Sequence, residues 1–160
     1  MPDVNKIIAD YKEAARQKEL ERQAELDAKK QQRALNAKVA EDCIKTIIEP
    51  VFENVKAQII QNGFPCDVEF VSKKDHFLSE AKMFAIGIKI LIQNKADSYP
   101  GNKCNLLYEG SFEAQEITKS EWIAMAGKPA DKSPPVAISR VNTEMIEKDL
   151  EQFLLKVFKV

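Results

Sequence analysis

Histidine, glycine and paired cysteines are scarce in this chain, and each shortage excludes a class of site. The 160 residues include one histidine and five glycines. A single histidine excludes any metal site that needs two imidazole ligands. No glycine stands in the GxGxxG or GxxxxGK[ST] context of a nucleotide-binding loop. The three cysteines, Cys43, Cys66 and Cys104, form no CxxC pair, so we expect no zinc site, no disulfide framework and no cofactor.

Long apolar runs and an excess of one charge are also missing. The chain has 24 Lys and Arg against 25 Asp and Glu, and the two signs are interleaved. The strong positive field of a nucleic-acid-binding protein is therefore not expected. No apolar run approaches the roughly 20 residues that span a bilayer, and residues 1–6 lack the pattern of a signal peptide. We expect a cytoplasmic protein that binds neither nucleic acid nor membrane.

Residues 3–62 are predicted to form one very long helical stretch. They contain a single proline, Pro50, and they end in Asn62-Gly63, a pair typical of a helix stop. Pro50 has no amide hydrogen and its ring collides with the carbonyl of Thr46, so we expect the helix to be kinked or broken near Pro50. Seven apolar side chains after residue 43 share one broad arc at about 100° per residue, which predicts a face packed on a core. These are Ile44, Ile47, Ile48, Val51, Phe52, Val55 and Ile59.

The earlier part of the same helix carries a much thinner apolar stripe. This arm stripe falls within an arc of about 100°, on roughly the opposite side of an ideal helix from the later, core-facing arc. It consists of Leu20, Ala24, Ala28, Gln31, Leu35 and Val39. A third, short apolar group precedes it, at Val4, Ile8, Tyr11 and Ala15. A helix that is polar nearly all round is commonly one that bridges solvent or meets a partner.

Alternation of apolar and polar residues after Gly63 predicts an antiparallel sheet of three to five strands. The expected strands cover residues 66–71, 82–94, 105–109 and 111–117, with a further short one at 136–139. Ser120 is expected to cap a short helix that runs through Met125 and ends at Gly127. Asn142 is expected to cap the last helix, whose apolar stripe includes Ile146, Leu150 and Phe153.

These elements predict an α+β fold with both major helices on one face of the sheet. We expect two parts: a protruding helical arm, residues 1–38, and a compact domain, residues 39–160. The leading functional hypothesis is a non-enzymatic protein-interaction or assembly module. Its arm would mediate homo-oligomerisation, most simply as a homodimer, or docking to a protein partner. The expected interface consists of the arm stripe together with Trp122 and Met125.

Two other hypotheses follow from the same residues. The first is a small dimeric chaperone-like protein that holds an extended client on a sheet edge or on an apolar surface around Trp122, Ile123 and Met125. The second is a thiol-dependent enzyme in which His76 activates Cys104 or Cys66. No catalytic group is assigned, since a cysteine–histidine pair is defined by geometry that spacing alone does not reveal.

Overall fold

The computed structural model of the chain describes residues 1–72, 82–92, 103–111, 113–123 and 131–159. It divides into two units, Met1–Leu35 and Asn36–Val160, and each unit is described here by itself. The predicted boundary after residue 38 stays a prediction. His76 and Met125 lie outside the described residues.

The first unit is helical and exposed to solvent along its whole length. It belongs to helix α1, Val4–Cys43. Asp3 begins the helix, because its carboxylate accepts a hydrogen bond of 3.1 Å from the amide of Lys6. Further along, Arg16 pairs with Glu13 at 2.9 Å. Short-range contacts of this kind, combined with strong helix formers, explain why the segment is helical without a core.

The interruption predicted near Pro50 takes the form of a widened helical turn. A π-helix, η1 (Ile44–Ile48), follows α1, and helix α2 (Glu49–Gln61) begins directly after it. The amide of Glu49 donates to the carbonyl of Ile44, five residues back. Pro50 occupies the first turn of α2, where its missing amide hydrogen leaves no bond unmade. Helix α2 ends at Gln61, and Gly63 just beyond it has a positive φ of 91°.

The sheet is antiparallel, and the predicted α+β fold is confirmed. In the described residues it has six strands in the order β1-β2-β3-β4-β5, and β6 also pairs with β4. The strands are β1 (Cys66–Ser72), β2 (Lys82–Leu91), β3 (Lys103–Ser111), β4 (Glu116–Trp122), β5 (Asp131–Lys132) and β6 (Val136–Ala137).

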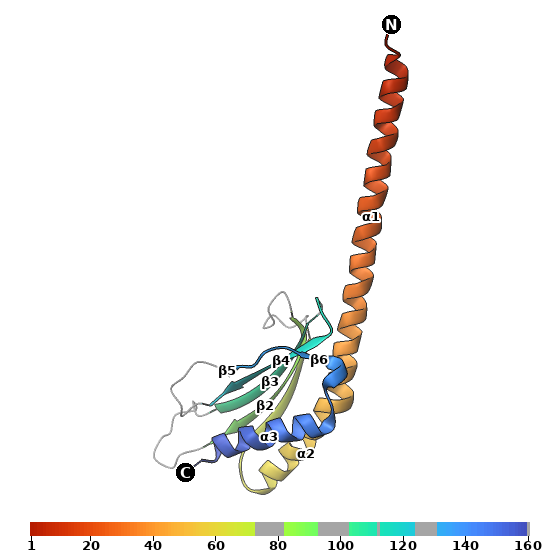
Figure 1. Cartoon of the computed structure of the whole chain (residues 1–160). Coiled ribbons are helices and arrows are strands. Elements are labelled where there is room, and N and C mark those ends of the chain that lie inside the picture. The colour runs from red at the N-terminus through yellow and green to blue at the C-terminus, as the bar shows by residue number, and fades with distance from the viewer. Residues whose placement is uncertain (73–81, 93–102, 112, 124–130, 160) are drawn as a thin grey trace. The chain divides into compact units, whose positions relative to one another are not determined.

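One face of the sheet packs against α2 and helix α3, Thr143–Val157 (Figure 1). The register places Val68 beside Ile88 and Ile88 beside Leu106, so these side chains share the helix-covered face. Alternate residues of β2 and β3 on this face are fully buried, as the period of two predicts. The core-facing arc of the long helix is likewise confirmed, because Ile44, Ile48 and Phe52 are completely buried.

Helix α3 begins where the sequence predicts. The side chain of Asn142 accepts a hydrogen bond of 2.8 Å from the amide of Met145, which is the expected N-cap. Ile146, Leu150 and Phe153 lie in the core. A short 3-10 helix, η3 (Ile138–Arg140), leads into this segment.

The short helix predicted from Ser120 is wrong. Ser120, Glu121 and Trp122 belong to strand β4, in which Ser120 pairs with Leu107 of β3. Local capping chemistry favours a helix there, but pairing with β3 decides the conformation because a strand position depends on its neighbours across the sheet. The strand predicted at 111–117 accordingly lies later in the chain, at Glu116–Trp122.

Glycine allows the helix and the sheet to come unusually close at one point. A Cβ atom at Gly110 would lie 2.7 Å from the Cβ of Ala40. Ala40 is fully buried and belongs to the last turns of α1. The backbone of α1 therefore lies against strand β3 with no side chain between them beyond the methyl group of Ala40.

We predict that Gly110→Ala destabilises the fold by about 1 to 3 kcal/mol, the usual cost of overpacking a core. Chemical denaturation of the second unit measures this loss. Gly87→Ala is the matched control, since its added methyl group would meet side-chain atoms of Asn105 at 3.1 Å and Leu107 at 3.3 Å, and no backbone atom closer than 3.7 Å. An equal loss of stability in the two variants would contradict the close packing at Ala40.

Candidate functional site

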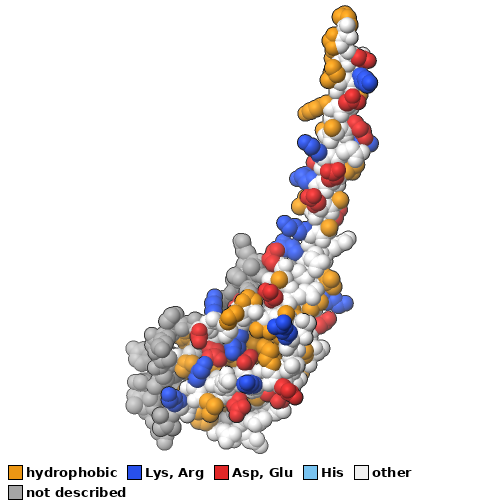
Figure 2. Space-filling model, viewed as in Figure 1, with side chains coloured by type: hydrophobic (Ala, Val, Ile, Leu, Met, Phe, Trp, Pro, Cys, Tyr) orange, Lys and Arg blue, Asp and Glu red, His pale blue; other side chains and the backbone are white. Residues whose placement is uncertain are grey.

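The arm stripe is exposed over most of its length. Leu20 is 56% exposed and Leu35 is 50% exposed, and Ala24, Ala28 and Gln31 are exposed as well. Val39 belongs to the second unit and is half-buried there. Orange apolar side chains appear among acids and bases along this helix in Figure 2. The structure therefore places five of the six stripe residues together on one solvated helix.

A second apolar group lies at the start of α1. Val4, Ile7, Ile8 and Tyr11 are all exposed, and we call them the N-terminal patch. Their spacing of three, four and seven residues places them on one face of the helix. Ile7 extends the group that the sequence predicts at Val4, Ile8 and Tyr11. The patch has no partner among the described residues of the first unit, since every residue of that unit is exposed.

The second unit has an apolar groove between α2 and α3. Its volume is about 410 Å³, and Val55 of α2 forms one side of it. The remaining lining residues come from α3 and the residue after it: Glu147, Leu150, Glu151, Leu154, Leu155 and Phe158. Leu155 is 68% exposed, and Phe158 is held by an edge contact with Phe64 whose ring centroids are 4.9 Å apart. We call this feature the α2–α3 groove.

Sequence reasoning missed the α2–α3 groove. It recognised the core-facing stripe of α3 but not the side chains beyond it. The available signal was the adjacent pair Leu154-Leu155, because two neighbouring leucines widen an apolar face past the arc that a sheet covers. Leu154 packs partly against the core, whereas Leu155 remains in solvent.

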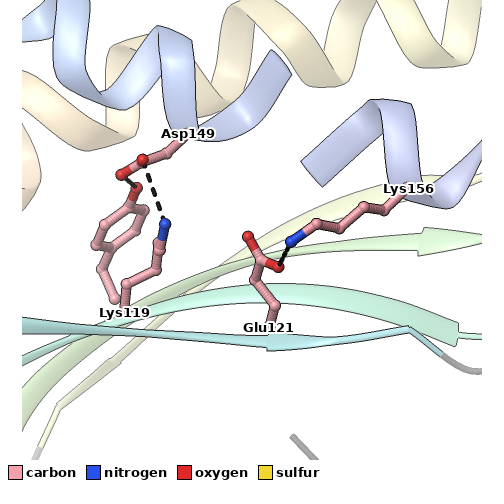
Figure 3. Close-up of polar contacts among 5 residues, drawn as sticks. Lys119, Glu121, Asp149 and Lys156 are labelled. Carbon is pink, nitrogen blue, oxygen red and sulfur yellow. Dashed lines mark hydrogen bonds and ion pairs between the residues drawn. The ribbon is translucent and has the colours of Figure 1, made fainter. Parts of the chain in front are cut away.

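A layer of polar contacts fixes α3 on the sheet (Figure 3). The hydroxyl of Tyr108 donates a hydrogen bond of 2.6 Å to Asp149, and the ammonium group of Lys119 lies 3.2 Å from the other carboxylate oxygen. Lys156 reaches Glu121 at 2.7 Å. Lys119 and Glu121 point from β4 toward α3, so each of these two charges meets an opposite charge of the helix.

The charge states of this polar layer suit the attachment of α3 to the sheet. Burial, and then the hydrogen bond to Asp149, raise the pKa of Tyr108, so its hydroxyl remains protonated. The hydrogen bond to Glu121 raises the pKa of Lys156, which keeps that amine charged. Each of these groups has a partner of complementary charge or hydrogen-bonding capacity across the contact between α3 and the sheet.

The surroundings of Cys66 and Cys104 bear on the thiol hypothesis, which stays a prediction. Cys66 and Cys104 both pair with Ile90, one from each side, so strand β2 separates them. Burial raises the pKa of the Cys66 thiol to about 11, whereas an activated thiol needs a lowered pKa. Cys104 is buried in the core. A pairing with His76 lies outside the described residues.

Trp122 stands apart from the apolar group expected around it. It is 44% exposed and lies opposite Asn105, on the sheet face away from the helices. Ile123 instead packs partly against the core. Met125, the other residue of the expected surface, lies outside the described residues.

The part of the chain that the structure describes offers neither a cluster of metal-binding side chains nor a helix that could cross a membrane. Those residues contain no group of three or more His, Cys, Asp or Glu side chains placed to hold a metal ion. None of the described helices is both long and apolar enough to cross a membrane. No protein family matches the chain, and no curated protein or solved structure is significantly similar to it.

We predict that Tyr108→Phe lowers the free energy of unfolding by about 1 to 3 kcal/mol, because it removes a buried hydrogen bond to a carboxylate. Denaturant titration measures the change. Tyr11→Phe removes the same hydroxyl from a side chain that is 73% exposed, so its effect should stay within about 0.5 kcal/mol. Equal stability of the Tyr108→Phe variant and the wild-type chain would show that the polar layer does not hold α3.

Proposed function

We propose that this chain is a non-enzymatic protein-interaction or assembly module whose N-terminal helical arm mediates homo-oligomerisation. The exposed arm stripe is the observation that carries the proposal. A helix that keeps large apolar side chains in solvent has surface area to bury against a partner. Docking of the same stripe on a different protein is the alternative use of the surface.

The spacing of the arm stripe favours pairing with a second copy. Successive members are separated by four, four, three, four and four residues, so the series reads the same from either end. An antiparallel pair of identical helices can therefore place Leu20 opposite Val39, Ala24 opposite Leu35, and Ala28 opposite Gln31. Such an interface is two-fold symmetric and uses the same patch on both copies.

The side chains in this register also fit one another. The small Ala24 meets the larger Leu35, and alanines allow helix axes to approach closely. The spacing contains an 11-residue repeat, at roughly 3.67 residues per turn, which is close to the 3.6 of a straight helix. Two nearly straight helices could therefore keep the stripe in contact along its length.

The arm stripe alone supports only weak association. Burying one exposed leucine contributes at most about 1.5 to 3 kcal/mol, and a symmetric pair would bury four leucines, two from each copy. Because Leu20 and Leu35 are each about half-exposed, the real gain is smaller. Association costs about 4 to 15 kcal/mol in lost freedom, which is of similar size. A stable assembly would need a further contact.

We predict that Leu20→Glu or Leu35→Glu shifts the chain toward monomer, because each places a charge in the symmetric interface. Sedimentation equilibrium would show an increase of at least about tenfold in the dissociation constant, a modest effect for a central apolar contact. Leu26→Glu is the matched control. Leu26 is 49% exposed but falls outside the stripe, so its variant should associate like the wild-type chain. A wild-type chain that stays monomeric would contradict homo-oligomerisation.

Deletion of residues 1–34 is predicted to leave a folded second unit that no longer assembles. The residues from Asn36 onward contain the whole hydrophobic core, so cooperative unfolding should persist in the shortened chain. Circular dichroism and sedimentation together measure both properties. An unfolded product would contradict the proposed division of the chain, and an unchanged oligomer would contradict the role of the arm.

A chaperone-like use of the sheet edge is the second candidate function. Among the described strands, β1 pairs only with β2, so its other edge is available to an extended segment. Asp67 and Glu69 are exposed on this strand, and Glu69 pairs with Lys89 of β2 at 2.8 Å. Charged side chains on an edge strand disfavour its pairing with a second copy. Suppression of client aggregation by the chain lacking residues 1–34 would favour this candidate over the arm-based module.

A further inference from the structure

The α2–α3 groove leaves apolar surface of the second unit in solvent. The large apolar side chains exposed among the described residues of this unit are Ile60, Trp122, Leu155 and Phe158. Leu155 and Phe158 both line the groove. Its floor is already formed, because Leu150 is buried and Leu154 is half-buried. A preformed apolar floor with exposed apolar side chains at its margin suits a partner that inserts apolar groups.

The lining of the groove has the period of a face that packs on another helix. Glu147, Glu151, Leu154 and Phe158 follow one another at intervals of four, three and four residues, so they form one row along α3. The row spans about 16 Å at 1.5 Å per residue. Helices pack through rows of this spacing, whereas an extended strand presents side chains with a period of two. A partner helix therefore fits the groove better than a partner strand.

The charged side chains that line the groove are both acidic. Glu147 and Glu151 are exposed to solvent on its rim. Within the part of the chain that the structure describes, neither carboxylate has an ion-pair partner. A cationic partner is attracted to such a rim, whereas a fatty-acid carboxylate or an anionic lipid surface meets charge of its own sign.

The lysines of α2 and α3 do not offset these acids in the groove. Lys56 lies 3.8 Å from a carboxylate oxygen of strand β1, and Lys156 lies 2.7 Å from a carboxylate oxygen of strand β4. Lys148 is about 90° round α3 from the row that lines the groove. Lys159, beyond the end of α3, does not line the groove either. The rim therefore keeps a local negative charge.

We infer that the α2–α3 groove binds an amphipathic helix of a different protein, one that carries large apolar side chains followed by lysine or arginine on the same face. Its apolar groups meet Leu154, Leu155 and Phe158. Its cations meet Glu147 and Glu151, one to two turns away along α3. This site lies within the second unit, so it goes beyond the proposed function and does not depend on self-association of the arm.

The exposed apolar stretches of α1 lack this chemistry, which is why the occupant is a different protein and not a second copy. Along the arm stripe itself, the nearest charges on a regular helix are the acids Glu21 and Asp27. The flanks of the N-terminal patch carry both signs, with Asp3 and Glu19 at least as near its centre as Lys12. An acidic rim repels the first surface and does not select the second.

The test uses the full-length chain and two labelled helical peptides, each about five turns long. Both present leucines at one end of a single face, followed two turns later by lysines in one peptide and by glutamates in the other. Fluorescence anisotropy should show about tenfold tighter binding of the lysine peptide at low ionic strength, because attraction replaces repulsion at both rim acids. Binding of neither peptide below about 1 mM, or no preference for lysine, would overturn the inference.

A pair of substitutions locates the binding site. Leu155→Gln should weaken binding of the lysine peptide at least about fivefold, since it removes an apolar side chain that is 68% exposed at the groove. Ile60→Gln is the matched control, because Ile60 is 49% exposed on α2 and does not line the groove. That variant should bind like the wild-type chain. Equal weakening by the two substitutions would place the peptide elsewhere and overturn the inference.

Charge reversal tests the acidic rim. Glu147→Lys combined with Glu151→Lys should reverse the preference, so that the glutamate peptide binds more tightly than the lysine peptide. Asp10→Lys combined with Glu25→Lys changes the net charge by the same amount at exposed positions of the arm, and it should leave the preference for lysine in place. A reversal in both double variants, or in neither, would contradict recognition by the rim.

Self-association separates this inference from the proposed function. Loss of dimers in the Leu155→Gln variant would show that a second copy fills the groove, and it would overturn the assignment to a different protein. A chain that stays monomeric yet binds the lysine peptide in a Leu155-dependent way would support the groove site and contradict homo-oligomerisation through the arm.

Discussion

The packing of Ala40 on Gly110 is the constraint from which the rest of the second unit follows. A helix backbone can lie against a strand only where neither element carries a bulky side chain, and these two residues meet that condition. The contact sets where the long helix becomes part of the core. Leu35 is half-exposed and Asn36, the next residue, is buried, although both belong to α1. Helix α1 therefore passes from solvent into the core without any change of secondary structure.

Two later features adjust how the helices meet the sheet. The π-helical turn before Pro50 contains one more residue than an α-helical turn, so it rotates the following apolar face by about 100° relative to an unbroken α-helix. The polar layer then fixes α3, because the buried hydroxyl of Tyr108 must have an acceptor and Asp149 is that acceptor. With α3 held in this way, Leu155 lies beyond the sheet and contributes to a groove.

Features set by the period of the sequence could be predicted, and features set by contacts across the fold could not. The arc from Ile44 to Ile59 and the cap at Asn142 follow from local spacing and chemistry, and both are confirmed. The helix predicted from Ser120 is wrong because the strand conformation of this residue depends on pairing with β3, which local sequence does not reveal. The groove is only partly predictable for a similar reason. The pair Leu154-Leu155 indicates a widened apolar face, but it does not specify which side chains a neighbouring helix leaves uncovered. The interface residues of the arm remain predictions.

The composition of the arm also bears on how an assembly would behave. A broad apolar stripe would bind tightly but would leave a free chain prone to aggregation, whereas the thin stripe of alanines and two leucines leaves the isolated helix well solvated. Under the proposed pairing, Gln31 lies opposite Ala28 near the two-fold axis. A polar residue at that position lowers affinity and favours a register in which its amide remains in contact with water. Specificity would then come from several weak contacts acting together, because the antiparallel register aligns all the residue pairs of the stripe at once.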